Sequence, residues 1–331
     1  MHIEIISISI LLFVCSVVLT VLDLAVSGIV SLAFGIAFKK AFLKGLFSLL
    51  IPVILALYGI FLERNTFKTN KVELEFAGLP AAFDGYCIIQ LSDIHSRSFA
   101  GRPKALGKAV KKVNNLDADL IAFTGDIITM SPDELDVTAP ILSRFKAKNG
   151  VVSVLGNHDY GVYAKPDKGQ VRAADCSREV ARREAAVGWD ILLDESRIIS
   201  RGEDSIAVIG VENTTPSRHF ASRGNLGKAS EGTEGLFRIL LSHDPMHWDM
   251  EVVGKDYPLT LSGHTHAVQF SLFGWCPSKY MYKQYRGLYE KGGQCLYVNI
   301  GLGETIVPLR IGTPPEITLI TLRRSNSRQT K

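Results

Sequence analysis

The chain has 331 residues, long enough for one large domain with an appendage or for two modest domains. The formal net charge is only +4 and no long basic block is present, so nucleic acid is not expected as a partner. The five cysteines form no C-x-x-C pair, and an odd number cannot all pair within one chain, which argues against a disulfide framework and a cysteine zinc site.

Residues 1–64 are predicted to anchor the chain in a membrane. Between residues 5 and 38 the single charged residue is Asp23, and a helix of that length would exceed the ~30 Å hydrocarbon core. This run is therefore one span plus an interfacial or broken piece, or two tight segments. Residues 46–62 form a second apolar run of spanning length. A signal peptide fits poorly because no basic region precedes the apolar run, and a buried helical hairpin of a soluble protein is a third interpretation.

A polar linker over residues 65–70 is predicted to lead into a catalytic domain over residues 71–325, followed by a tail over residues 326–331. The predicted strands cover residues 71–76, 86–90, 120–124, 151–155, 191–193, 198–200, 206–211, 236–241, 259–261, 268–272, 295–299 and 317–322. Helices are predicted over residues 103–116, 133–145 and 171–187, a surface loop over 160–170 and a mobile loop over 212–235. Strands that alternate with helices indicate parallel crossovers, and the order predicts an α/β fold of two packed sheets with helices outside.

Five of the predicted strands end in side chains that commonly bind metal ions. The strand over residues 86–90 leads to Asp93 and His95, which share one side of the extended chain because side chains alternate. The other four strand ends contribute Asp126, Asn157 with His158, His243, and His264 with His266. Each could be a capped turn or a satisfied histidine, but five such ends are improbable by chance. Mixed carboxylate, amide and imidazole donors suit Mn²⁺, Fe²⁺ or Zn²⁺, and their number predicts two ions.

This series of motifs resembles that of the calcineurin-like metallophosphoesterase superfamily. The motifs are Asp93-x-His95, Gly125-Asp126, Gly156-Asn157-His158-Asp159, His243 and Gly263-His264-x-His266, and their order and spacing match across residues 87–322. The resemblance implies a two-sheet sandwich flanked by helices and a metal-dependent phosphoric ester hydrolase. It also implies a dinuclear metal centre at the strand ends.

The resemblance also implies a role for each motif residue. Asp93, His95 and His266 would bind one ion, Asn157, His243 and His264 the second, and Asp126 would bridge both. His158 would not be a ligand; it would face the phosphate and either protonate the leaving oxygen or stabilise the developing charge. Asp159 would orient a neighbouring histidine or cap the following loop.

The apolar amino terminus and three later segments, residues 241–245, 261–266 and 315–319, look like membrane-bound members of the superfamily. These include the UDP-2,3-diacylglucosamine pyrophosphatases, although Ala267 and Ile300 stand where glycine and arginine are frequent. The resemblance implies hydrolysis of a phosphodiester or pyrophosphate bond in a lipid-linked or cell-envelope substrate, with membrane lipids as partners. The catalytic domain is expected on the cytoplasmic side, since unpaired cysteines suit a reducing compartment.

Four basic residues are weaker candidates for contacts with substrate. Arg218 lies in the predicted mobile loop, and Lys279, Lys283 and Arg286 lie among aromatic residues in a segment that could hold an anionic head group or be an ordinary hairpin. Two other functions stay open at this point. One is a phosphomonoesterase, such as a phosphoprotein phosphatase, or a cyclic-nucleotide phosphatase, with an incidental anchor, and the other is a non-catalytic membrane sensor.

Overall fold

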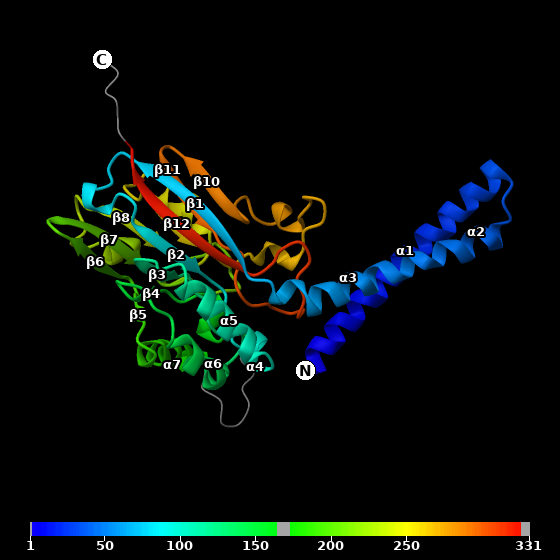
Figure 1. The fold of residues 1–331 in the computed structure, drawn as a ribbon, viewed down its shortest axis with the longest axis horizontal. Coiled ribbons are helices and arrows are strands. Elements are labelled where there is room, and N and C mark those ends of the chain that lie inside the picture. The colour runs from blue at the N-terminus through cyan, green and yellow to red at the C-terminus, as the bar shows by residue number, and fades with distance from the viewer. Residues whose placement is uncertain (1, 164–172, 326–331) are drawn as a thin grey trace, which may run out of the picture.

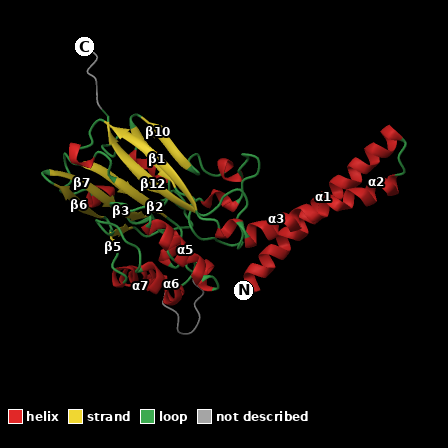
Figure 2. Cartoon of the chain, viewed as in Figure 1, coloured by secondary structure: helices red, strands yellow, loops and turns green. Residues whose placement is uncertain are grey.

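Residues 2–163 and 173–325 are described by the structure, a computed structural model. The predicted tail at 326–331 and most of the predicted loop at 160–170 lie outside these residues. A helical hairpin at the amino terminus projects from an α/β domain that is built on two six-stranded sheets (Figures 1 and 2). The predicted α/β class with two sheets and flanking helices is confirmed.

The hairpin consists of α1 (His2–Phe34), which runs against α2 (Phe38–Gly45), a short 3-10 turn and α3 (Leu50–Phe61). Two helical stretches, Ile5–Phe34 and Phe38–Asn65, are long and apolar enough to cross a membrane. Most of their large apolar side chains face outward, which suits a helix surrounded by lipid. α1 is continuous over 33 residues, about 50 Å at ~1.5 Å per residue, so the predicted break within residues 5–38 falls at the turn after Phe34.

The first sheet has the order β1-β12-β2-β3-β4-β5. Its strands are β1 (Lys68–Phe76), β2 (Cys87–Leu91), β3 (Leu120–Phe123), β4 (Val151–Ser153), β5 (Asp190–Ile191) and β12 (Glu316–Arg324). Strands β2 to β5 are parallel, whereas β12 runs antiparallel to β2. Its outer face packs on α5 (Pro103–Asn114), α6 (Leu135–Leu142) and α7 (Ala173–Ala186). β1 starts at Lys68, so part of the predicted linker is already strand.

The second sheet has the order β10-β11-β9-β8-β7-β6. Its strands are β6 (Glu195–Arg201), β7 (Asp204–Gly210), β8 (Phe237–Leu241), β9 (Leu259–Ser262), β10 (Gly287–Lys291) and β11 (Gln294–Val298). Two short helices, α4 (Arg97–Ala100) and α8 (Leu226–Ala229), lie in loops of the domain. The inner faces of the two sheets meet in one buried core, where Ile88, Leu120 and Val152 face Val208, Ile239 and Leu261. Burial of both faces of the central strands explains their continuous apolar runs.

The predicted strand over residues 268–272 is wrong. The chain instead makes a 3-10 turn over His266–Gln269, and Phe270 forms only an isolated bridge with Ile311. Ala267 and Val268 have φ values of 48° and 43°, in the left-handed region that a strand cannot use. The Gln269 side chain donates hydrogen bonds to the carbonyls of Val307 and Leu309, which fixes this turn against a segment far along the chain.

Candidate metal centre

The predicted ligands come together at the carboxyl ends of five strands. β2, β3 and β4 of the first sheet end just before Asp93, Asp126 and Asn157, and β8 and β9 of the second sheet end just before His243 and His264. The two sheets present these ends at the same edge of the sandwich, so within each group of possible ligands the atoms lie within 4.8 Å of one another. Most of them are fully buried, with His264 and His158 partly exposed.

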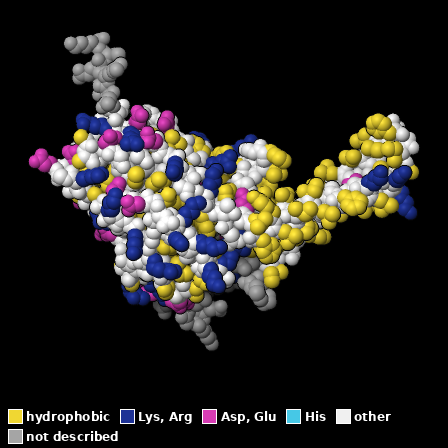
Figure 3. Space-filling model, in the orientation of Figure 1, with side chains coloured by type: hydrophobic (Ala, Val, Ile, Leu, Met, Phe, Trp, Pro, Cys, Tyr) yellow, Lys and Arg dark blue, Asp and Glu magenta, His cyan; other side chains and the backbone are white. Residues whose placement is uncertain are grey.

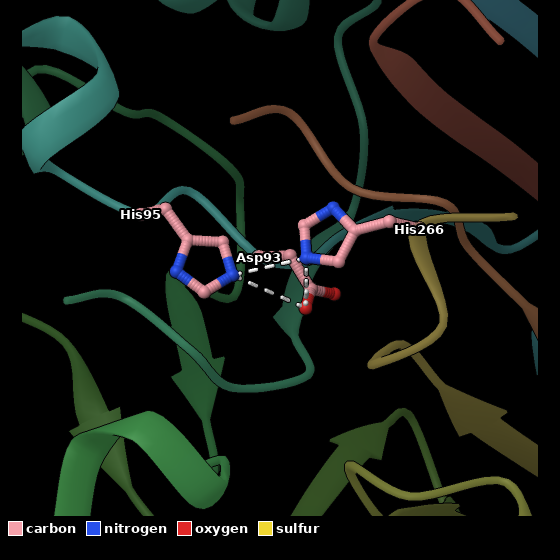
Figure 4. A group of neighbouring side chains, drawn as sticks. All are labelled: Asp93, His95 and His266. Atoms are coloured by element: carbon pink, nitrogen blue, oxygen red, sulfur yellow. Dashed lines mark hydrogen bonds and ion pairs between the residues drawn. The ribbon is translucent and has the colours of Figure 1, made fainter. Parts of the chain in front are cut away.

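The first cluster consists of Asp93, His95 and His266 (Figure 4). His95 Nε2 lies 3.0 Å from His266 Nε2, and Asp93 Oδ1 lies 3.2 Å from His266 Nε2 and 3.7 Å from His95 Nε2. Asp93 Oδ1 is buried and has no hydrogen-bond partner among the described residues. Two ring nitrogens and a carboxylate oxygen thus point at one another, an arrangement that suits a cation between them.

The second cluster consists of Asn157, His243 and His264. Asn157 Oδ1 lies 2.7 Å from His264 Nδ1 and 3.2 Å from His243 Nε2, and the two ring nitrogens are 3.3 Å apart. Asp126 stands between the two clusters, because its Oδ2 is 3.2 Å from His243 Nε2 and 3.7 Å from His95 Nε2. One carboxylate therefore reaches both sets of donors.

Backbone carbonyls hold three of the histidine rings from behind. His95 Nδ1 is 3.1 Å from the Ile128 carbonyl, and His243 Nδ1 is 2.7 Å from the Thr124 carbonyl. A carbonyl can only accept, so each Nδ1 donates to it and each Nε2 faces the cluster. His158 Nδ1 makes the same bond to the Thr129 carbonyl at 2.7 Å.

The charges in the site are strongly coupled. Burial opposes ionisation of Asp93 and Asp126, yet the neighbouring histidines outweigh it and hold the pKa of each carboxyl below its ordinary value. Burial would lower the pKa of His243, but the Asp126 carboxylate raises it to about 10. Burial lowers the pKa of His158 and of His266. Two carboxylates that stay ionised although buried are the kind of group that a bound cation would stabilise.

Several of these residues have unusual backbone conformations. Positive φ values between 45° and 73° are found at Asp93, His95, Asp126, His264 and His266. Non-glycine residues occupy this region at a cost, and such strain gathers at functional sites. Glycines make room beside them, because a Cβ on Gly156 would collide with the Asp126 carboxylate and a Cβ on Gly263 with Ser92 and Asp93.

Asp159 holds the loops rather than a histidine. Its Oδ2 accepts hydrogen bonds from the backbone N–H groups of Asp126 and Gly156 at 2.8 and 2.9 Å, and its Oδ1 accepts from Ile128 at 3.1 Å. Burial and the nearby Asp126 charge raise the pKa of Asp159 to about 8. Of the two predicted roles, the structure thus supports capping, and this one side chain ties the loop after β3 to the loop after β4.

A cavity of about 530 Å³ opens over the two clusters. Asp126, Asn157, His158, His264 and His266 form its floor, and residues that the sequence did not single out form its walls: Arg97, Met130, Tyr163, Phe220 and the segment 304–308. The Tyr163 ring packs on His158 at 4.5 Å, and the Tyr282 hydroxyl lies 3.3 Å from His264 Nε2. Tyr163 and Phe220 belong to no motif, so nothing in the sequence distinguished them, whereas Tyr282 is one of the aromatic residues in the segment that the sequence suggested could hold an anionic head group.

The weaker candidates lie elsewhere. Arg218, Lys279, Lys283 and Arg286 are not among the described residues that line the cavity. Lys279 lies over the Tyr280 ring, Lys283 is 3.8 Å from Asp249, and Arg286 lies near Tyr285 and Ser271. A direct contact between these side chains and a substrate stays a prediction.

Arg310 is a buried residue beside the site that the sequence did not single out. Its side chain is fully buried and donates to the carbonyls of Ile300, Gly301 and Thr313, and its Nη2 lies 3.4 Å from His266 Nδ1. A buried guanidinium is costly unless its donors are satisfied. Here it fastens the loop after β11 behind the first cluster.

Comparisons with known proteins agree with this geometry. A family profile described as "Calcineurin-like phosphoesterase" matches residues 87–268. The uncharacterized metallophosphoesterase YkuE of Bacillus subtilis is 31% identical over 87% of this chain and 98% of its own length. A transmembrane protein with metallophosphoesterase domain from Danio rerio is 30% identical over 86% of this chain and 64% of that protein. The UDP-2,3-diacylglucosamine pyrophosphatase LpxG of Chlamydia muridarum is 26% identical over 81% of this chain and 93% of its own length.

The profile covers more than half of the chain, and the Bacillus relative matches nearly from end to end. The match runs through every strand end that carries a predicted ligand, from β2 to β9. On these grounds the chain belongs to the calcineurin-like phosphoesterase family and is a hydrolase that acts on phosphate esters.

Proposed function

We propose that this hydrolase works with two divalent ions, held by Asp93, His95 and His266 on one side and by Asn157, His243 and His264 on the other, with Asp126 shared. The observation that carries the proposal is the convergence of atoms of metal-ligand type on one point, most clearly His95 Nε2, His266 Nε2 and the unpartnered Asp93 Oδ1. Mixed oxygen and imidazole donors suit Mn²⁺, Fe²⁺ or Zn²⁺.

When bound, two such ions would polarise the phosphoryl oxygens and lower the pKa of an attacking water. The chain's own residues supply position and protons. Asp126 keeps the two donor sets at a fixed separation, and its Oδ1 accepts the backbone N–H of His158 at 2.8 Å. That bond places the His158 ring at the cavity floor, with Nδ1 tied to Thr129 and Nε2 left to serve the leaving oxygen or the developing charge.

The substrate that we propose is a phosphodiester or pyrophosphate attached to a lipid, such as one of the UDP-2,3-diacylglucosamine type. Three features support it. The walls of the cavity include the apolar side chains of Met130, Phe220 and Ile306. The chain carries two helices of spanning length. Relatives with matching length include a UDP-2,3-diacylglucosamine pyrophosphatase.

We further propose that the anchor spans the membrane as a two-helix hairpin with the catalytic domain on the cytoplasmic side. The five free cysteines support a reducing compartment. The lysines near the hairpin tip, Lys39, Lys40 and Lys44, favour the reverse orientation, and Lys68 and Lys71 on the other side offset them. Alkaline phosphatase fused after Ala37 should be active and fused after Ser325 inactive; the opposite result would place the domain outside the cytoplasm.

Hydrolysis of bis(p-nitrophenyl) phosphate by the detergent-solubilised full chain tests the proposed chemistry. Activity should vanish after treatment with a chelator and return with Mn²⁺, Fe²⁺ or Zn²⁺. A protein that binds these ions but has no turnover of diesters or monoesters would be a sensor instead. Turnover of monoesters alone would indicate a phosphomonoesterase with an incidental anchor.

A further inference from the structure

The apolar helix α3 joins the catalytic domain without a flexible linker. Glu63 and Arg64, directly after α3, are both buried in the domain. Glu63 Oε2 accepts the backbone N–H of Gly312 at 2.8 Å, and Arg64 donates two hydrogen bonds to the Glu304 carboxylate at 3.2 and 2.9 Å. The domain is therefore held at a fixed height and angle relative to the helix.

The helix and the domain approach each other closely at Gly59. A Cβ at this position would lie 2.7 Å from the Arg310 carbonyl and 3.2 Å from the Ile311 side chain. Beyond this contact, Phe61 and Leu62 still expose most of their side chains. If α3 lies in a bilayer, the bilayer surface thus reaches the domain itself.

Exposed apolar side chains of the domain lie on this same side. We call Phe273, Trp275, Tyr280, Met281 and Ile306 the apolar rim. Phe273 is 99% exposed and Ile306 81%, the two most exposed large apolar side chains of the described catalytic domain. Figure 3 shows hydrophobic side chains gathered where the hairpin meets the domain, with Lys and Arg side chains beside them. Single exposed apolar residues are ordinary, but a group beside an apolar helix marks an interaction surface.

Specific contacts join the rim to α3. Phe270 bridges Ile311, the residue that packs on Gly59, and Leu272 bridges Trp275 across the turn that carries Phe273. The Gln269 side chain donates hydrogen bonds to the Val307 and Leu309 carbonyls. These bonds join the two loops of the rim to each other and to the carboxyl-terminal end of α3.

The rim also forms one edge of the catalytic cavity. Ile306, Val307 and Pro308 line the cavity together with His158. Ile306 has a φ of 57°, a conformation that a β-branched residue rarely adopts, and its side chain is largely exposed. The same loop thus faces the phosphate-binding floor on one side and solvent beside α3 on the other.

We infer that the apolar rim lies in the headgroup region of the bilayer that α3 enters, so that the cavity receives phosphoesters directly from that surface. The occupant is lipid because the rim continues the exposed apolar surface of α3. Trp275 and Tyr280 have the ring types that favour the interface, and Lys279 beside them suits lipid phosphates. The substrate class is an amphiphilic phosphoester whose phosphate lies at headgroup level, and this part of the inference rests on the proposed function.

Fluorescence of Trp275 tests the position of the rim. The chain has three tryptophans, and Trp189 and Trp248 are buried in the domain whereas Trp275 is 47% exposed. The full chain is reconstituted into phosphatidylcholine vesicles with or without bromine on the acyl chains. Brominated lipid should quench the wild-type emission and leave that of Trp275→Phe unchanged. Equal wild-type emission in both vesicles would overturn the inference. The same result is expected if a second copy of the chain, and not lipid, covers the rim.

A pair of substrates with the same leaving group tests the consequence for catalysis. These are p-nitrophenyl methyl phosphate in solution and p-nitrophenyl hexadecyl phosphate in the same vesicles. The double variant Phe273→Asn, Met281→Gln removes two rim side chains that do not line the cavity, and Asn tolerates the φ of 48° at position 273. Turnover of the long-chain ester should fall about tenfold, since less apolar area is buried at the interface, while turnover of the short ester is unchanged.

The matched control is the double variant Val137→Gln, Ile198→Asn. Both residues are 45% exposed, and β6, which carries Ile198, lies at the end of the domain remote from α3 (Figure 1). It should behave as the wild type on both esters. If the rim variant keeps wild-type turnover of the long-chain ester, or if the wild type cleaves the short ester and not the long one, the inference fails. If the wild type cleaves neither ester, the proposed function itself fails.

Discussion

At the scale of single residues, the role of His158 does not follow from its position alone, because a backbone carbonyl holds its ring as it holds those of His95 and His243. Its backbone N–H binds Asp126 and its Nδ1 binds Thr129, whereas its ring packs between His95 and Tyr163. It lies close to the proposed ligands Asp126 and His95, so distance alone does not separate a ligand from a group that serves the substrate. Its role therefore needs a measurement that reports metal content and turnover separately.

Replacing His158 with Asn should lower kcat by roughly 10²–10⁴-fold, the usual contribution of a positioned acid or base. The metal content should stay at the wild-type value, because in the proposed assignment six other side chains and Asp126 retain the ions. The loss should be smaller for p-nitrophenyl esters, whose leaving group needs no proton. His219→Asn, at an exposed histidine outside the cavity, is the control. Loss of metal in the His158 variant would instead make His158 a ligand.

At the scale of elements, the strand ends could be predicted because the residues that indicate each of them are adjacent in the sequence. An apolar run followed by Asp93 or His243 indicates both the strand and the ligand that follows it. The aromatic walls could not be predicted, since Tyr163 and Phe220 meet only through loops whose course depends on distant packing. The wrong strand over residues 268–272 has the same origin. This segment is held by hydrogen bonds between Gln269 and residues 305–311. Those residues lie too far along the chain for a local stretch of sequence to reveal the contact.

Close approach of two loops also makes the site sensitive to a single methyl group. Gly263→Ala would place a Cβ against Ser92 and Asp93, between the ends of β9 and β2. Overpacking of this kind costs about 1–3 kcal/mol, and here relief requires movement of the Asp93 carboxylate. We expect metal content and hydrolysis to fall while circular dichroism stays unchanged. Gly78→Ala, where the added Cβ meets nothing within 4 Å, is the control; equal activity of the two variants would show that this approach does not hold the site.

At the scale of the whole molecule, the helical hairpin is joined to the catalytic domain by direct contacts. Glu304 accepts from both Arg64 and Arg102, and it lies in the segment that lines the cavity. The sequence predicted a short polar linker over residues 65–70 after an anchor that ends at Arg64, but Arg64 is buried in an ion pair with Glu304, a partner far along the chain. The boundary that would best preserve the domain therefore lies at Glu63 rather than Lys71.

Two shortened chains test that boundary. A chain that begins at Lys71 lacks the Arg64 partner of Glu304 and the first residues of β1, whereas a chain that begins at Glu63 keeps both. Arg102 still pairs with Glu304 in the shorter chain, so the loss should be smaller than the about 3–5 kcal/mol that follows when a buried charge keeps no partner. Each kcal/mol moves the melting temperature of a domain this large by about 2–4 °C, so the shorter chain should melt lower in differential scanning calorimetry, by less than about 20 °C. Identical melting temperatures would show that the junction contributes nothing to stability.

The bound metal per chain tests the central claim most directly, measured by mass spectrometry on the full-length wild type and on Asp126→Asn. The wild type should hold two divalent ions per chain, because the two clusters share the Asp126 carboxylate. Removing a residue that only hydrogen-bonds a metal ligand lowers metal affinity by about 10–100-fold. Because Asp126 is itself a proposed ligand, the variant should lose more than this for both ions, and its hydrolytic activity should be lost as well. A variant that keeps two ions and near-normal turnover, or an active wild type with no more than one ion, would contradict a dinuclear centre bridged by Asp126.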